Sequence, residues 1–124
     1  MAAGLLYPLY LLVMGSAALC FLAAYRARAR TPRHMRLALT GLALDVTGTL
    51  VVLIVHRVLG VPMHVEHALV VVWHRRCAYA STGLLLLVAL GGWRRWRIHP
   101  LLGRIFLPLY LVTLAVAIVG YFPY

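Results

Sequence analysis

Four long apolar runs dominate this sequence and limit what it can fold into. They cover residues 4–25, 37–55, 77–93 and 105–122, and polar or basic links separate them. A membrane-spanning helix needs about 20 apolar residues, with a range of about 17 to 25. Strands of a membrane barrel are shorter and alternate in polarity, which these runs do not. Because backbone polar groups in lipid must be bonded internally, each run is expected to be a transmembrane α-helix.

The composition agrees with a membrane protein and argues against a soluble one. Of the 124 residues, 65% are hydrophobic and 11% are charged, and the only acids are Asp45 and Glu66. A soluble domain has roughly a quarter of its residues charged. We therefore predict an all-α integral membrane four-helix bundle with antiparallel up-down topology, in a single membrane domain over residues 1–124. The expected helices are at about residues 4–25, 35–59, 64–93 and 100–122.

The positive charge of the chain indicates its orientation. All 12 basic residues are arginines, and the formal net charge is +10. Nucleic-acid binding is one explanation for such a charge, but in so apolar a chain the positive-inside rule explains it better. Nine arginines lie in or beside the links that join the first run to the second and the third run to the fourth. Only Arg57, Arg75 and Arg76 fall on the other side. We expect both termini outside, both basic links in the cytoplasm, and no nucleic-acid partner.

Histidines mark the ends of the predicted helices. Of six histidines, His34 opens the second helix and His56 closes it. His74 opens the membrane part of the third helix, and His99 opens the fourth. His34 and His99 are therefore expected at the cytoplasmic surface, and His56 and His74 at the outer surface. The other two histidines are expected to be solvated, with auxiliary metal contact as the alternative: His64 and His67.

The two outer histidines are expected to lie at the same height. His56 is 20 residues from Arg36, and His74 is 20 residues from Arg94. Both arginines mark the inner boundary of the membrane, and a helix rises 1.5 Å per residue, so each histidine lies about 30 Å above that boundary. Two level histidines on neighbouring helices can ligate a haem iron from both sides or begin a copper site.

These histidines suggest a haem or copper cofactor, with no cofactor as the alternative. We predict His56 and His74 as metal ligands. His34 and His99 are further cofactor-binding candidates, although the arginines around them disfavour a bare cation. The competing interpretation is that each histidine is an interfacial residue, because its ring is half polar and half apolar and suits a membrane boundary.

Asp45 lies midway along the second predicted helix. At 100° per residue, it shares one stripe with the histidines at both ends of that helix, and with Gly41 and Gly48. Small residues on such a stripe allow another helix, or a flat cofactor, to approach closely. An ionised acid at the bilayer centre costs at least about 2.5–3.5 kcal/mol, so Asp45 is expected to face the bundle interior. Two roles stay open: a hydrogen bond to a neighbouring helix, through Tyr110 or Ser81, and proton or counter-ion service to a cofactor.

Several motifs resemble those of a known family. They are His34-Met35-Arg36-Leu37, Val55-His56, His74, His99, Arg104-Ile105-Phe106-Leu107-Pro108-Leu109-Tyr110 and Val119-Gly120-Tyr121. With histidine spacings of 22 and 25 residues, the chain from His34 to Tyr121 resembles the CtaM/YozB family of small bacterial four-helix membrane proteins. The resemblance implies a helper in the maturation of haem-copper (cytochrome c) oxidases in the bacterial inner membrane. It implies the oxidase or its maturation proteins as partners, and the four helix-end histidines as functional residues.

Three functions remain open at this level. The first is an assembly or cofactor-handling factor, the second a small b-type cytochrome, and the third a cofactor-free structural subunit of a membrane complex. His34 and His56 are 22 residues apart, about 33 Å along a helix. Cofactors held by ligands so far apart would be poorly placed for electron transfer between them. The sequence contains no nucleophile with a base, phosphate loop or acid pair, so we do not expect an enzyme.

Overall fold

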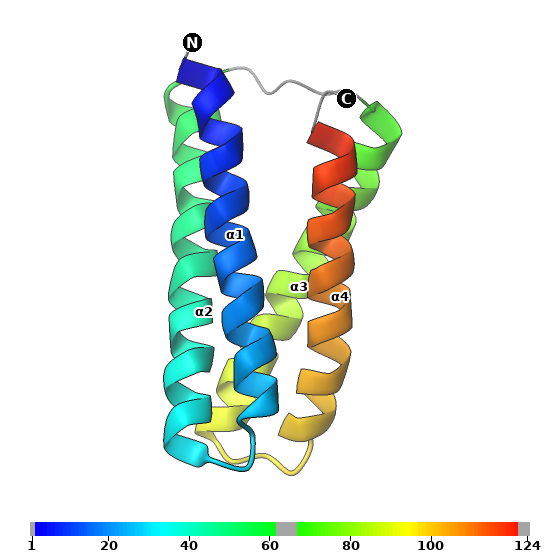
Figure 1. Cartoon of the computed structure of the whole chain (residues 1–124). Helices are drawn as coiled ribbons and strands as arrows, with labels where there is room; N and C mark the ends of the chain where they lie inside the picture. The colour runs from blue at the N-terminus through cyan, green and yellow to red at the C-terminus, as the bar shows by residue number, and fades with distance from the viewer. Residues whose placement is uncertain (1, 62–66, 122–124) are drawn as a thin grey trace. The chain divides into compact units, whose positions relative to one another are not determined.

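The computed structural model describes residues 2–61 and 67–121, and these residues are almost entirely helical. Within this part of the chain there is no strand, which confirms the all-α prediction. The helices follow the predicted order (Figure 1): α1 (Ala2–Arg26), α2 (Thr31–Leu53) with the π-helical turn η1 (Ile54–Val58), α3 (Ala68–Trp93) and α4 (His99–Tyr121).

All four helices are long and apolar enough to cross a membrane. Their candidate spans measure 22 to 28 residues, which is enough to cross a bilayer core that needs about 20. Large apolar side chains stand exposed on each of them, among them Leu12, Leu50, Leu69 and Ile105. Such extensive apolar exposure would be unfavourable in water, and it fits a multi-pass membrane protein.

The helix ends differ from the predicted ones where local signals compete. The second helix was expected from residue 35 but begins at Thr31, because Pro32 suits a first helical turn. The third helix was expected from residue 64. Instead His67 is extended at the helix N-cap and α3 begins at Ala68, while residues 64–66 lie outside the described part of the chain.

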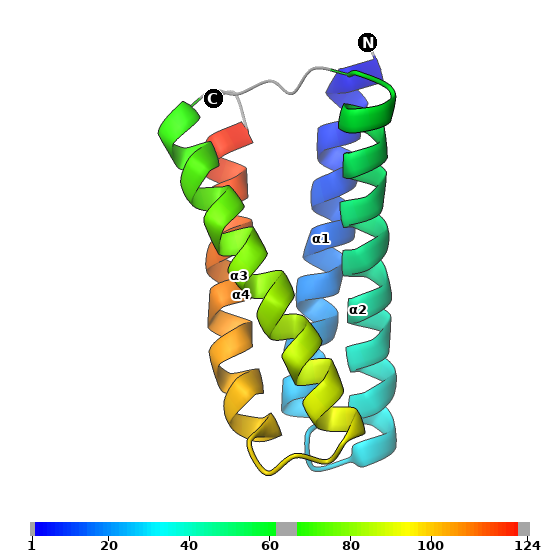
Figure 2. The same ribbon diagram turned by 180° about the vertical axis from the view of Figure 1, so that it is seen from behind.

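The chain divides into two compact units, Met1–His64 and Val65–Tyr124. Each unit is a pair of packed helices: α1 lies beside α2, and α3 lies beside α4 (Figures 1 and 2). The arrangement of all four helices as one bundle stays a prediction.

In the first unit, α2 packs on α1 through its glycine stripe. A Cβ atom on Gly41 would lie 2.8 Å from Cε1 of Phe21, and one on Gly48 would lie 3.0 Å from Sδ of Met14. The later glycine on α2 thus meets the earlier residue on α1. The two helices therefore run in opposite directions. The predicted small-residue stripe is confirmed, and it receives a helix.

In the second unit, α3 and α4 also run in opposite directions. Gly91 of α3 faces Leu102 near the start of α4, and Gly120 at the end of α4 faces Val70 near the start of α3. Midway between these contacts, the Oγ atom of Ser81 lies 3.0 Å from the hydroxyl of Thr113, within hydrogen-bond distance. This polar contact lies near the middle of the interface between α3 and α4.

Candidate functional site: histidines bound to backbone carbonyls

His34 joins the start of α2 to the end of α1. Its Nδ1 donates a hydrogen bond to the carbonyl of Ala24, at 2.8 Å. That carbonyl lies in the last turn of α1. Its usual helical donor, the N–H of Arg28, donates to the carbonyl of Tyr25 instead. The imidazole therefore satisfies a carbonyl that the helix end would leave without its usual partner.

His99 forms the equivalent contact in the second unit. It is the first residue of α4, and its Nδ1 donates to the carbonyl of Val88 in α3, at 3.0 Å. The ring lies against Gly92, where a Cβ atom would come within 2.9 Å of Cε1. The absence of a side chain at Gly92 leaves room for the imidazole.

His74 crosses from α3 to the middle of α4. Its Nδ1 donates to the carbonyl of Thr113, at 3.1 Å. The hydroxyl of Thr113 donates to the carbonyl of Leu109 at 2.7 Å and also meets Ser81, and both hydroxyl side chains are buried. Thr113 was not predicted as a site residue, although a hydroxyl in the middle of an apolar run is a signal for such a contact.

His56 lies inside η1, the widened turn at the end of α2. Its Nδ1 donates to the carbonyl of Val61, at 2.6 Å. Gly60 allows the chain to turn back so that the carbonyl of Val61 reaches the ring, because its φ of +65° is a left-handed conformation that glycine adopts without strain. π-helical turns such as η1 often accompany functional sites.

All four helix-end histidines use the same ring nitrogen. A carbonyl oxygen only accepts, so Nδ1 is the donor in each case, and the lone pair of a neutral ring lies on Nε2. Histidines that ligate metals usually make this contact, since it fixes the tautomer and the ring orientation. The same bond also serves a purely structural histidine, because it satisfies a polar ring nitrogen in an apolar setting.

Neither unit brings two of these histidines together. His34 and His56 lie near opposite ends of the α2–η1 segment, and His74 and His99 lie on different helices toward opposite ends of the second unit. The predicted partners, His56 with His74 and His34 with His99, come from different units, so their pairing stays a prediction. Among the residues that the structure describes, no three His, Cys, Asp or Glu side chains gather to hold a metal ion.

Asp45 is buried on the glycine stripe of α2. Its side chain is 6% exposed, and it lies between the two buried glycines of that stripe. This burial confirms the expectation that the carboxyl group avoids the apolar surface. Its two predicted roles, hydrogen bonding and proton or counter-ion service, both remain open.

Comparisons with known proteins add no family to these observations. No family model, curated protein or solved structure matches the chain. The chemistry and the geometry of the histidines therefore guide the functional conclusion.

Proposed function

We propose that this chain is an integral membrane accessory protein that holds a haem or a copper ion through histidine Nε2 atoms. It would serve the maturation of a haem-copper oxidase in the bacterial inner membrane. The observation that carries the proposal is the set of four Nδ1–carbonyl hydrogen bonds, one at each helix-end histidine. They orient four rings with Nε2 as the nitrogen that can coordinate a metal.

His56 and His74 are the proposed principal ligands. Both are half-buried, and both are expected at the outer surface of the membrane. Haem suits isolated histidines better than copper does, because the porphyrin supplies four nitrogens and the protein needs to add only one or two. When bound, the metal centre would supply redox or ligand-transfer chemistry, while the histidines hold it and fix its position.

The oxidase is proposed as the partner because of the motifs that resemble the CtaM/YozB family. An electron carrier across the bilayer is the weaker candidate. His34 and His56 lie on one continuous helical segment 22 residues apart, about 33 Å, so their cofactors would be too distant for direct transfer.

Spectra and metal analysis of the purified protein test the cofactor. The protein would be extracted from membranes in neutral detergent, loaded separately with haem and with Cu(I), and examined by visible absorption and elemental analysis. We expect His56→Asn and His74→Asn to lose most of the binding. Asparagine retains a donor near the position of Nδ1 but cannot replace Nε2 as a ligand, so the fold should survive.

His67→Asn is the matched control. His67 is exposed and extended at the N-cap of α3, so its replacement should leave binding unchanged. Equal haem and copper binding by the wild type and by the double variant of His56 and His74 would remove the ligand role. Normal oxidase assembly in cells that lack this protein would remove the oxidase from the proposal and leave the cofactor result standing.

A further inference from the structure

We propose that the link between α3 and α4, residues 94–98, binds the phosphate headgroups of anionic phospholipids at the membrane surface. The inference rests on the membrane location proposed above and is independent of the histidine chemistry. At the end of α3, one arginine adopts a backbone conformation that normally belongs to glycine.

The end of α3 forms a Schellman motif. The N–H of Trp96 donates to the carbonyl of Gly91 at 2.8 Å, and the N–H of Arg95 donates to the carbonyl of Gly92 at 3.3 Å. In this motif the residue after the C-cap takes a left-handed conformation, and glycine is the usual choice because it has no Cβ. Here that residue is Arg95, with a φ of +54°.

An arginine at this position therefore costs conformational free energy that a glycine would not cost. Among the described residues it is the one non-glycine residue with a positive φ, and Gly60 shows that this chain uses glycine where a similar φ is needed. Backbone strain of this kind persists where a side chain performs a function. The guanidinium of Arg95 is therefore expected to bind something.

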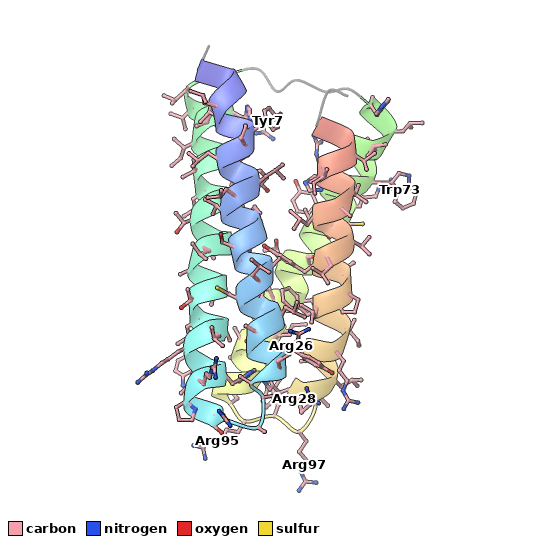
Figure 3. All side chains as sticks on the ribbon, viewed as in Figure 1. Tyr7, Arg26, Arg28, Trp73, Arg95 and Arg97 are labelled. Atoms are coloured by element: carbon pink, nitrogen blue, oxygen red, sulfur yellow. The ribbon has the colours of Figure 1, made fainter. Side chains whose placement is uncertain are left out.

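Within the described part of the second unit, residues 67–121, no acidic side chain is available to it. No residue from 67 to 121 is acidic, so the positive charge of the link has no counter-charge in this part of the chain. Arg94, Arg95 and Arg97 are all exposed, and Figure 3 shows the side chains of Arg95 and Arg97 pointing away from the ribbon. An anion from outside residues 67–121 is therefore needed to neutralise this charge.

The apolar residues beside these arginines favour a lipid phosphate over a soluble phosphate as the anion. Trp93 is 86% exposed, Ile98 52% and Trp96 37%. Tryptophan prefers the level of lipid headgroups, where its ring is partly in an apolar and partly in a wet environment. The fork of an arginine matches phosphate oxygens in a bidentate way. The Trp side chains of residues 93–97 can thus enter the headgroup layer while the Arg side chains bind phosphates at the same level.

The test uses the full-length protein in mixed micelles of neutral detergent. Energy transfer from tryptophan to dansyl-labelled phosphatidylglycerol or phosphatidylcholine measures the apparent affinity for each lipid, and thermal unfolding measures stability. We expect the wild type to prefer phosphatidylglycerol. Arg95→Gly should raise the Tm by a few degrees, because it relieves the left-handed residue, and yet weaken phosphatidylglycerol binding about fivefold.

Two further variants keep the result interpretable. Arg95→Gln should weaken phosphatidylglycerol binding about as much as Arg95→Gly, without the gain in Tm. Arg75→Gln removes an exposed arginine of the same unit far from the link, and it should leave the lipid preference unchanged. Glycerol 3-phosphate should not compete at concentrations comparable to the lipid.

Three results would overturn the proposal: an unchanged lipid preference in Arg95→Gly and Arg95→Gln, an equal loss in Arg75→Gln, or full competition by glycerol 3-phosphate. Failure of the membrane location is distinguishable from these. In that case the protein would leave the membrane pellet in an alkaline carbonate wash, before any lipid is titrated.

Discussion

At the scale of single residues, the four helix-end histidines have one observed role, in hydrogen bonding, and one proposed role, in metal binding. Nδ1 fastens one chain segment to the carbonyl of another, as in the contacts of His34 with Ala24 and of His74 with Thr113. Nε2 carries the lone pair that could bind a metal. The first role contributes about 1 kcal/mol per hydrogen bond to the stability of the fold, and the second contributes to it only when a cofactor is bound.

Asp45 allows a residue-scale prediction about charge in the membrane. Asparagine keeps hydrogen-bonding capacity but cannot ionise, whereas leucine removes both. We expect Asp45→Asn to keep the Tm of the wild type and its effect on oxidase maturation. We expect Asp45→Leu to be destabilised by about 1–3 kcal/mol, because leucine removes the polar interaction of the buried carboxyl group. Thermal unfolding in detergent and the oxidase spectrum of the membranes check this. Normal folding of Asp45→Asn with loss of maturation would instead assign Asp45 an ionisable role.

At the scale of helices, close approach depends on the glycine stripe of α2. α1 presents the ring of Phe21 and the Cβ atom of Cys20 to Gly41, at 2.8 Å and 3.2 Å from the position of an added Cβ. Phe21 is itself buried, so the ring has little room to move. The pairing of α1 with α2 therefore relies on a position without a side chain.

This predicts opposite effects for two glycine substitutions in the first unit. Gly41→Ala should destabilise the protein by about 1–3 kcal/mol through overpacking. Gly15→Ala, on α1, meets nothing within 4 Å and should stabilise it by about 0.5–1 kcal/mol, because alanine favours a helix over glycine. Chemical or thermal unfolding in detergent measures both. A stabilised Gly41→Ala variant would show that the two helices can separate without loss.

At the scale of the whole molecule, the arginines predict an orientation of the protein in the membrane. Nine of the 12 lie in or beside the two basic links, and retention of such links in the cytoplasm is the commonest determinant of topology. Cation–π contacts of Arg28 with Tyr25, at 4.7 Å, and of Arg76 with Trp73, at 5.5 Å, place aromatic rings beside charges near helix ends. Aromatic residues in such places are typical of the membrane interface.

Thiol labelling tests the predicted orientation. Single cysteines at Ala2 and Ala29 would be introduced after replacement of Cys20 and Cys77, which are free thiols in the structure. We expect a membrane-impermeant reagent to label position 2 in intact cells and position 29 only after lysis. The reverse pattern would place both basic links outside. It would also move the proposed lipid-binding link, residues 94–98, away from the cytoplasmic leaflet.

Much of the fold could be predicted from the sequence. The four helices follow from run length, because lipid-exposed backbone must bond to itself and a helix does so within one segment. The glycine stripe and the burial of Asp45 follow from helical periodicity. The start of α3 at Ala68 and the π-helical turn Ile54–Val58 were missed, since neither has a distinct signal in an apolar and basic stretch.

The sequence by itself therefore determined the four helices, the buried glycine stripe of α2 and the positions of the histidines along the helices. Tertiary structure alone decided what those histidines bind: Ala24 for His34, Thr113 for His74 and Val88 for His99. The physical reason is that each partner is a backbone carbonyl. Every residue has such a group, so no residue type marks it, and the register between two packed helices selects the carbonyl that comes within hydrogen-bond distance of the ring.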